Sequence, residues 1–437
     1  MTATAIATST TNSGTERCDC VIIGGGPAGC SAGAVLAQHG RKVIVLEREK
    51  FPRYHIGESL IPFTYPSLER IGMIPKLRAS SFPKKYSVQF VSPSGRASQP
   101  FYFYNRYDRE TVAQTWQVLR SEFDEMMMEN TRSLGADVRE ESTVTELLRR
   151  NGRYYGVRVK RADGTEYEIH APVTIDATGR EAIAATRNAW RRGDPKLNKV
   201  AVWTYYEGAV RDPGIDEGAT TVAFIPNKGW FWYIPQNNNR VSVGVVADGK
   251  YLTRDGIKDP KTIFHREVPE NKWIEQHLTG GKPCGEYWLT AEYTFRSEFC
   301  SDDGLVLAGD AFGFLDPVFS SGLMLALKSG VAAGDAVHQA LLDDDTSSAK
   351  FADYGAMMCE GMENMRKLVY AFYDPTISFR TVTDKYPEMH GILTDCLSGD
   401  VNRDFSDLFK AFAEFTSIPE PLPFGMPAPG RSSMIAA

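Results

Sequence analysis

Short apolar runs alternate with amphipathic stretches near the start of the chain. Residues 20–23 (CVII) and 42–46 (KVIVL) are mostly apolar and short, as is typical of strands buried inside a parallel sheet. The stretch between them has helical character as far as His39, and Gly40 ends it. This order predicts a strand–helix–strand unit close to the N-terminus.

Patterning further along the chain predicts three other regions. Residues 305–308 (LVLA) form another buried strand, followed by a long helix from about 322 to 342. The middle region, about 198–300, contains alternating runs such as TTVAFIP and RVSVGVVAD that predict a sheet. The C-terminal third is helical, with an amphipathic helix over 351–374. We therefore expect an α/β fold: a discontinuous three-layer nucleotide-binding domain, an inserted antiparallel-sheet substrate domain and a helical C-terminal region.

The expected domain boundaries follow these patterns. In chain order they are a disordered tail (1–16), a nucleotide-binding domain in three segments (17–85, 110–197 and 300–345), a substrate-side sheet domain in two (86–109 and 198–299), and a helical region covering the substrate cavity (346–437). The tail contains Thr, Ala and Ser without a basic start or apolar stretch, unlike a signal peptide. The Pro-rich segment 417–430 is expected to be extended and poorly ordered.

Composition limits the classes of function. The 437 residues carry a net charge of −6, which argues against a nucleic-acid partner and a basic membrane-binding surface. No apolar run approaches the roughly 18 residues of a membrane-spanning helix. The seven cysteines are scattered, which fits a reducing, cytoplasmic setting, and no His, Cys or Glu cluster has metal-ligand spacing. We expect no bound metal.

A glycine-rich loop joins the first strand to its helix. It reads Gly24, Gly25, Gly26, Pro27, Ala28 and Gly29. Gly24 allows a tight turn, Gly26 lets the backbone approach a pyrophosphate, and Gly29 lets helix and strand pack closely. The helix N-terminus offers N–H groups to phosphates. Glu47, 23 residues after Gly24, can accept hydrogen bonds from a ribose. The context favours a dinucleotide site over a simple glycine-rich turn.

A second nucleotide element, Gly309-Asp310, follows the strand at 305–308, where Asp310 can bind the ribityl chain of a flavin. This pairing resembles the FAD-dependent monooxygenase superfamily typified by para-hydroxybenzoate hydroxylase. The middle motif of that family is represented only by residues 176–180 (DATGR), a form seen in members that do not bind NAD(P)H firmly. The resemblance implies FAD contacts from Arg53, Gln117 or Arg120, Val144, Asp310, Pro317 and Gly322. Alternatively, Arg120 is a surface arginine at a helix start.

Residues 229–235 (GWFWYIP) match the WxWxIP motif of flavin-dependent halogenases. In a strand, Trp230 and Trp232 lie on one face, where two indoles beside a flavin can block a hydroxylase-like approach of substrate. The alternative is a Trp-rich strand that packs a core.

Residues 314–322 (FLDPVFSSG) match the halogenase pattern F-x-x-P-x-x-S-x-G. At the start of the following helix, the backbone N–H groups of Ser321 and Gly322 form a small anion site suited to halide. Ser320 is a candidate catalytic residue or, alternatively, a capping serine. Prenyl-chain reductases have a Gly-Glu-Gly type ending here. Tryptophan halogenases carry glutamate where Phe319 stands, which favours phenol or pyrrole substrates.

The third halogenase feature is a lysine. Residues 57–59 (GES) follow 51–53 (FPR), as in halogenases of phenols and pyrroles, and the active-site lysine of that family precedes an aromatic residue in the segment 81–86 (SFPKKY). Lys85 is the expected residue and Lys84 its competitor; in a strand, only one of them points inward. Glu58 can orient polar groups near the lysine or, alternatively, act as a helix N-cap carboxylate.

The resemblance implies a complete reaction. FADH2 from a separate reductase reacts with O2 to a C4a-hydroperoxide, which oxidises chloride or bromide to hypohalous acid. Lys85 then delivers the halogen to an electron-rich aromatic, a phenol or pyrrole, free or tethered to a carrier protein. The alternatives are a monooxygenase or prenyl reductase of the same fold, or a flavoprotein that releases free hypohalous acid.

Overall fold

The computed structural model describes residues 14–194, 196–226, 229–291 and 294–430. A six-stranded sheet forms the centre of one half of the molecule, and five of its strands run parallel. Its strands, in spatial order, are β21 (Ser301–Asp302), β22 (Leu305–Leu307), β12 (Val173–Asp176), β2 (Cys20–Ile23), β3 (Val43–Leu46) and β8 (Asp137–Arg139). The apolar runs predicted as buried strands therefore belong to one sheet, with β12 between β22 and β2, although about 260 residues separate the end of β3 from the start of β22.

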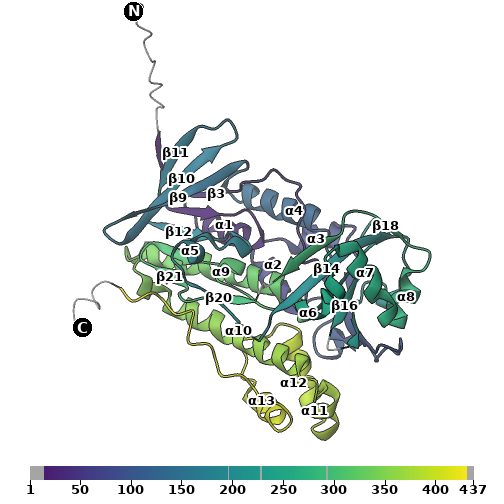
Figure 1. The fold of residues 1–437 in the computed structure, drawn as a ribbon. Helices are drawn as coiled ribbons and strands as arrows, with labels where there is room; N and C mark the ends of the chain where they lie inside the picture. The colour runs from purple at the N-terminus through teal and green to yellow at the C-terminus, as the bar shows by residue number, and fades with distance from the viewer. Residues whose placement is uncertain (1–13, 195, 227–228, 292–293, 431–437) are drawn as a thin grey trace, which may run out of the picture.

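Helices and a second sheet cover the two faces of this parallel sheet (Figure 1). On one face pack α1 (Pro27–Gln38), α4 (Arg120–Ser133) and the long α9 (Ser321–Leu342). On the other lies a four-stranded sheet of β1 (Thr15–Arg17), β11 (Glu166–His170), β10 (Arg153–Arg161) and β9 (Ser142–Arg150). The expected three-layer, discontinuous nucleotide-binding architecture is confirmed.

The expected disordered tail ends earlier than residue 16. Residues 1–13 lie outside the described residues, but Thr15 and Glu16 belong to β1, which pairs in parallel with β11. Glu16 also forms an ion pair with Arg139 at 2.8 Å. The prediction is therefore wrong for these residues, because β11 offers a strand edge to which the backbone of this short polar segment can bond.

The second half of the molecule is built on an eight-stranded sheet (Figure 1). Seven strands follow one another in the order β18 (Lys282–Pro283), β14 (Lys199–Glu207), β17 (Arg240–Asp248), β16 (Trp230–Pro235), β15 (Thr220–Phe224), β5 (Ser87–Val91) and β6 (Phe101–Tyr102), and β19 (Trp288–Ala291) also pairs with β14. Neighbours are antiparallel except β15 and β5, which run parallel. The expected antiparallel sheet is present with this one exception.

Strand alternation gives this sheet two different faces. Phe231 and Tyr233 point into a separate hydrophobic core that also contains residues of α7 (Pro260–Glu267) and α8 (Lys272–Leu278). Trp230 and Trp232 point the other way, toward the nucleotide-binding half. The sheet is thus anchored from behind by helices and offers its aromatic face to the space between the two halves.

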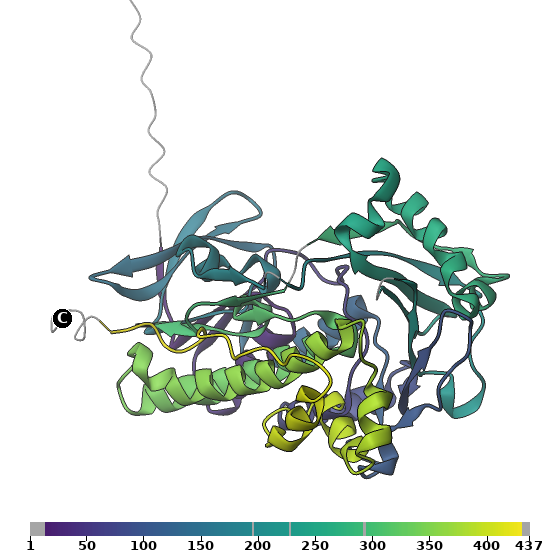
Figure 2. The same cartoon turned by 60° about the horizontal axis from the view of Figure 1, so that its bottom comes forward.

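The C-terminal third is helical, as expected. It contains α10 (Ala352–Tyr373), which runs along the nucleotide-binding half next to α9, and the shorter α11 (Phe379–Lys385), α12 (Met389–Leu397) and α13 (Ser406–Ala413), which lie beneath the junction of the two halves (Figure 2). The smaller elements are α2 (Tyr65–Arg70), α3 (Ile74–Ala79), α5 (Ile183–Arg187), α6 (Gly249–Leu252), the paired strands β4 (Lys84–Lys85) and β7 (Thr115–Trp116), and a sheet of β13 (Arg191–Gly193), β20 (Phe295–Ser297) and β23 (Gly313–Phe314).

The Pro-rich segment 417–430 is extended, as expected. The expectation that it is poorly ordered is wrong, because backbone hydrogen bonds attach it to residues 298–301. Gly425 N–H donates to the Glu298 carbonyl at 2.8 Å, Ala428 N–H donates to the Ser301 carbonyl at 2.8 Å, and the Met426 carbonyl accepts from Cys300 N–H at 3.1 Å. The prolines lack N–H groups, but the residues between them supply donors and acceptors to a strand edge. The segment therefore runs back along the nucleotide-binding half (Figure 2).

Candidate active site

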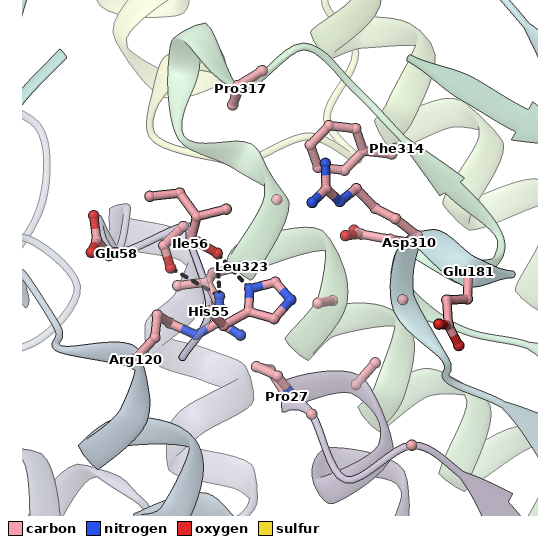
Figure 3. Close-up of a pocket in the computed structure, with 18 of the residues that line it drawn as sticks. Pro27, His55, Ile56, Glu58, Arg120, Glu181, Asp310, Phe314, Pro317 and Leu323 are labelled. Atoms are coloured by element: carbon pink, nitrogen blue, oxygen red, sulfur yellow. Dashed lines mark hydrogen bonds between the residues drawn. The ribbon is translucent and has the colours of Figure 1, made fainter. Parts of the chain in front are cut away.

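A cavity of about 370 Å³ lies between the two halves of the molecule. Figure 3 shows Glu58 and Arg120 on one side of it, Asp310 and Glu181 on the other, and Pro317 and Pro27 at opposite ends. The expected site residues that line it are Gly24, Gly26, Pro27, Ala28, Glu47, Arg53, Glu58, Arg120, Val144, Trp230, Trp232, Asp310, Pro317, Ser320 and Gly322. Gly29, Lys85 and Ser321 lie behind this lining.

The glycine loop leaves no room for side chains at two positions. Gly24 has a φ of +104°, and a Cβ there would lie 2.4 Å from the Ala177 carbonyl oxygen. A Cβ on Gly29 would lie 1.9 Å from the Gly24 oxygen. Gly26 precedes α1 without a side-chain cap, so the N-terminal amides of that helix face the cavity wall. The loop therefore has the close packing and open helix end that a pyrophosphate requires.

Glu47 is held at the end of β3 by backbone amides. Its Oε2 accepts from Gly25 N–H at 2.9 Å and its Oε1 accepts from Glu49 N–H at 2.9 Å. Arg53 Nη2 lies 3.8 Å from the same Oε2. Each carboxylate oxygen keeps a lone pair for a further donor, as a ribose contact needs.

Arg120 is engaged in fixing the backbone beside the cavity. Its Nε and Nη2 donate to Asp124 at 2.7 and 2.9 Å, and its Nη1 donates to the carbonyls of Ile56 and Gly57 at 2.8 and 3.1 Å (Figure 3). The alternative of a surface arginine is wrong, because Arg120 is buried. These bonds leave little donor capacity for a phosphate and instead clamp the turn that leads to Glu58.

Asp124 joins the two arginines of this wall and was not anticipated. Arg53 Nη1 donates to its Oδ2 at 3.2 Å, opposite the bonds from Arg120. Burial opposes ionisation of Asp124, but the charges and hydrogen bonds of Arg120, together with the charge of Arg53, outweigh it and lower the pKa of the carboxyl. The i, i+4 spacing of Arg120 and Asp124 in a helix was the signal that could have revealed the pair.

Asp310 provides a carboxylate on the far side of the cavity from Glu58 (Figure 3). Burial raises its pKa to about 6, although the charges of Arg180 and Arg120 act in the opposite sense. Glu47, the uncapped N-terminus of α1 and Asp310 all line the cavity, and these acceptors and donors fit the chemistry of FAD.

The two tryptophans of β16, Trp230 and Trp232, both line the cavity, as expected for alternate residues of a strand. Their rings lie 6.2 Å apart at 52°. Trp230 Nε1 donates to Tyr373 Oη at 2.9 Å, and Trp232 Nε1 donates to Ser242 Oγ at 3.0 Å. Satisfied N–H groups hold both indoles in fixed orientations, so they form a rigid wall.

The segment 314–322 forms a tight loop before α9. Ser320 has a φ of +55° and makes no side-chain cap bond, so the interpretation of Ser320 as a capping serine is wrong. The helix begins at Ser321, and the backbone of Ser321 and Gly322 forms its first turn. Phe319 packs between Phe372 and Phe379, with ring centroids at 5.7 and 5.9 Å.

Lys85, not Lys84, is the inward-facing lysine. Lys84 is exposed and Lys85 is 0% exposed, as alternation along β4 requires. Lys85 Nζ donates to Ser59 Oγ at 2.8 Å, and burial lowers the pKa of the amine to about 7. A Cβ on Gly218 would lie 2.1 Å from the Lys84 carbonyl oxygen, so only glycine there lets β4 take this position.

Ser59 and Thr220 stand between the lysine and the cavity, which both residues line. Their hydroxyl oxygens lie 2.8 Å apart. Gln117 Nε2 donates to Thr220 Oγ1 at 2.9 Å. Gln117, which was suggested as a flavin contact, thus helps to hold the hydroxyls of Thr220 and Ser59 in place. The amine of Lys85 does not line the cavity itself, but it is hydrogen-bonded to Ser59, which does.

Glu58 is buried in the cavity wall. Burial raises the pKa of its carboxyl, and Tyr205 Oη donates to Oε1 at 2.6 Å. The next helical turn begins at Pro62 with Ile61 at its N-cap, so the alternative of a capping carboxylate is wrong. Glu58 therefore places a buried carboxyl in the cavity wall.

Known proteins are similar to this chain in sequence and fold. The model of an FAD binding domain family matches residues 17–344. A 1H-pyrrole-2-carbonyl peptidyl-carrier-protein chlorinase of Pseudomonas fluorescens is 30% identical over 404 residues, covering 88% of this chain and 89% of its own. The chain belongs to the flavin-dependent halogenases.

Further relatives agree. The halogenase armH3 of Armillaria mellea is 33% identical over 346 residues, with coverages of 73% of this chain and 67% of its own. The structure of the flavin-dependent brominase Bmp2 superposes with a TM-score of 0.82 at 27% identity, covering 91% of this chain and 97% of that one. The chondrochloren halogenase CndH gives 0.76 at 27% identity, with coverages of 95% and 94%. FAD and halide are thus the cofactor and cosubstrate.

Two features of this halogenase concern its setting. Among the described residues, no helix combines the length and apolar character that a membrane crossing requires. Within the same residues, no group of three or more His, Cys, Asp or Glu side chains is arranged to hold a metal.

Proposed function

We propose that this halogenase oxidises chloride or bromide to hypohalous acid and transfers the halogen through Lys85 to an electron-rich aromatic ring, a phenol or a pyrrole. The observation that carries the proposal is the buried amine of Lys85, bonded to a serine that lines the cavity. A pKa of about 7 keeps much of this amine neutral at physiological pH. A neutral, desolvated amine can either hydrogen-bond hypohalous acid or attack its halogen.

Bound reduced FAD would supply, with O2, the oxidising equivalents for halide. The residues expected to hold it are those of the glycine loop, Glu47, Arg53, Val144 and Asp310. Asp176, in the weak middle motif, accepts from the N–H groups of Thr178 and Ala184 at 3.1 and 2.7 Å. That structural role supports the proposal that a separate reductase, instead of NAD(P)H bound here, reduces the flavin.

The halide is proposed to bind at the N-terminus of α9. Gly322 lines the cavity, and the helix behind it is 22 residues long, so its first amides carry the positive end of a full macrodipole. The site would hold an anion by amides, without a formal positive charge. Such a site can release the halide for reaction more readily than an arginine could.

The substrate is proposed to enter beneath the C-terminal region. Phe319 packs against Phe372 of α10 and Phe379 of α11, so these helices close the side of the site where tryptophan halogenases carry glutamate. Without a carboxylate base at this position, the ring must already be activated, as phenols and pyrroles are. The similarity to a carrier-protein chlorinase supports a tethered pyrrole as one form of the substrate.

The decisive test compares Lys85→Ala with Lys84→Ala in reactions that contain reduced FAD, O2, bromide and a simple phenol or pyrrole. We expect Lys85→Ala to lose halogenated product by at least about a hundredfold, while reoxidation of the flavin continues. Lys84→Ala, altered at the exposed neighbour, should retain activity. Full product formation by Lys85→Ala would contradict the proposed role of the lysine.

Mass spectrometry and a bait reaction separate the remaining chemistry. A halide-dependent gain in product mass supports halogenation, whereas a gain of one oxygen supports hydroxylation. Monochlorodimedone captures hypohalous acid that has left the protein. Halogenation of the bait at the same rate as the substrate would show that the acid is released and not delivered.

A further inference from the structure

Two motifs that are far apart in sequence meet at a tyrosine that belongs to neither. Trp230 Nε1, from strand β16, donates to Tyr373 Oη at 2.9 Å. Tyr373 Oη donates in turn to Asp316 Oδ2 at 2.9 Å. Asp316 lies within the segment 314–322 that leads into α9, and Tyr373 is the last residue of α10. A residue of the C-terminal region thus joins the indole wall of one half to the loop of the other half.

The hydroxyl of Tyr373 is used in both directions. An indole N–H can only donate, so the Tyr373 oxygen accepts the bond from Trp230. The hydroxyl has one proton, and the bond to Asp316 uses it. Phenylalanine at this position would keep the ring but lose both bonds. The substitution therefore separates the loop from the indole wall while changing the packing of α10 very little.

Asp316 fixes the shape of the loop before α9. Its other oxygen, Oδ1, accepts from Val318 N–H at 3.1 Å and caps the short 3₁₀ helix Pro317–Phe319. That helix leads to Ser320, whose φ of +55° is a conformation that a residue with a side chain keeps only where its surroundings hold it. Because α9 begins at the next residue, the bonds of Asp316 help to set where its first amides point.

The end of α10 contacts the same loop at a second point. Phe372, the neighbour of Tyr373, packs against Phe319 with ring centroids 5.7 Å apart. Asp316 precedes the 3₁₀ helix and Phe319 ends it, so α10 holds this helix at both ends. Residues of the 3₁₀ helix and of the first turn of α9 line the cavity, whereas the contacts from α10 reach them from behind the cavity wall.

We propose that Tyr373 is a positioning residue of the halide site, which holds the loop before α9 so that the first amides of that helix face the cavity. The inference rests on the proposed function, because it takes these amides as the place where halide binds. The bond from Trp230 fixes the hydroxyl of Tyr373, and the bond to Asp316 transmits that position to the loop. Loss of the hydroxyl should weaken halide binding and leave FAD binding unchanged.

The charges near the loop distinguish two ways in which Asp316 could act. Burial raises the pKa of Asp316 to about 6, although its hydrogen bonds and the charge of Lys199 act in the opposite sense. The ammonium of Lys199 lies 4.1 Å from the centre of the Tyr373 ring and 3.2 Å from Asp248. An anion near a halide repels it, whereas an anion that holds the loop supports the site. Removing the charge of Asp316 therefore has opposite results in the two cases.

The test compares Tyr373→Phe with Tyr370→Phe in protein loaded with oxidised FAD. Tyr370 lies one turn earlier in α10 and donates to Asp194 at 2.7 Å, so the control loses a similar bond away from the loop. Bromide is titrated into protein labelled with fluorotryptophan. The fluorine signal of Trp232, which lines the cavity and is assigned by its loss in Trp232→Phe, reports the dissociation constant. No turnover is needed, so the result is independent of halogen transfer by the lysine.

We expect Tyr373→Phe to raise the dissociation constant for bromide about fivefold, as for one lost hydrogen bond, and to leave that for FAD unchanged. Tyr370→Phe should match wild type. In turnover, Tyr373→Phe should raise the KM for bromide more than it lowers kcat, whereas general structural damage would lower kcat and FAD binding as well. Asp316→Asn should also weaken bromide binding, because its amide N–H group would face the donating hydroxyl of Tyr373.

Three results would overturn the proposal. Unchanged bromide binding in Tyr373→Phe would show that the hydroxyl does not position the loop. Equal weakening in Tyr370→Phe would show that α10 only supports the fold. Tighter bromide binding in Asp316→Asn would show that the acid acts by repulsion.

Anomalous scattering from bromide in wild-type crystals separates failure of the inference from failure of the proposed halide site. Bromide at the N-terminus of α9, together with normal binding in Tyr373→Phe, would overturn this inference alone. Bromide bound elsewhere in the cavity would overturn the proposed halide site and the inference with it. The comparison of Lys85→Ala with Lys84→Ala would still test halogen transfer in either case.

Discussion

Arg120 and Lys85 are both buried cations beside the same cavity, but their surroundings differ. Arg120 makes two bonds to the carboxylate of Asp124 and two to backbone carbonyls. Lys85 has a hydroxyl, Ser59, as its hydrogen-bond partner, and its amine lies 5.6 Å from the centre of the Phe103 ring. The pKa of Arg120 is raised, because the charge and bonds of Asp124 outweigh burial, whereas burial alone lowers that of Lys85.

The difference shows how one cavity wall can hold a charged cation that fixes the backbone and a second amine that is partly neutral. A buried cation with a buried anion stays charged and holds the backbone, here the turn before Glu58. Burial of a lysine without an anion favours the neutral amine, which is the form that the proposed halogen transfer requires. Four variants break or sharpen this comparison.

Removing the negative charge of Asp124, the partner of Arg120 and Arg53, should have the largest effect on stability. Asp124→Asn leaves Arg120 and Arg53 buried without their counter-charge, and we expect the free energy of unfolding to fall by about 3–5 kcal/mol. Urea denaturation measures the change. Asp335→Asn is the control, because it removes only exposed ion pairs with Arg70 and His39 and should cost under about 1 kcal/mol. Equal losses in the two variants would contradict the structural role of Asp124.

Replacing the unpaired cation should stabilise the protein at low pH. Lys85→Met removes the cost of burying an ammonium, and we expect a gain of about 1–4 kcal/mol at pH 6. In wild type the folded pKa is about 7, below the unfolded value near 10.4. The unfolded state therefore binds more protons between these values, and wild-type stability rises with pH across this window. Denaturation of wild type and Lys85→Met from pH 6 to 10 should show that the difference between their free energies of unfolding becomes smaller as the pH rises.

Removing the hydroxyl that holds the amine should have a smaller effect. Ser59→Ala deprives Lys85 of its hydrogen-bond partner without adding charge, and we expect halogenation to slow about tenfold, as for a lost hydrogen bond of about 1.4 kcal/mol. Ser348→Ala, which removes a buried serine bond to the Ala428 carbonyl far from the cavity, is the matched control. Unchanged product formation in Ser59→Ala would mean that the amine is positioned by packing alone.

The smallest effect is expected at Asp316, a buried acid that accepts a hydrogen bond from a tyrosine hydroxyl. Asp316 has a pKa raised to about 6 by burial, and the hydrogen bond from Tyr373 at 2.9 Å lowers it. Because the folded pKa is raised, the contribution of Asp316 to stability declines as pH rises from about 4 to 6. Tyr373→Phe should cost about 1 kcal/mol and extend this decline to higher pH, measured by denaturation across that range.

Much of the fold could be predicted because its signals are local. The glycine loop and the strands on either side of it form one continuous stretch, and the steric need for Gly24 and Gly29 is independent of the rest of the chain. The alternation of Trp230 and Trp232 is equally local. By contrast, the pairing of β1 with β11 joins residues about 150 positions apart, and no local sequence pattern predicts it.

The same distinction applies to the site. The alternation of Lys84 and Lys85 predicted that only one points inward, but which one depends on how β4 meets β7 and the Gly218 backbone. The role of Asp124 was not predicted, because it depends on hydrogen bonds from two arginines, one of which lies 71 residues away in sequence. The pKa values of Glu58 and Lys85 depend on burial, which is a property of the assembled halves.

The bonded Pro-rich segment has a practical consequence for building hybrid enzymes. Exchange between related halogenases of the C-terminal helices, which are proposed above to close over the substrate, is one way to alter which ring is accepted. Here residues after α13 return to the opposite half and bond to Glu298, Cys300 and Ser301. A donor's helices would therefore have to be grafted together with their own trailing segment, or the recipient's segment rejoined behind them, for the strand edge to remain covered.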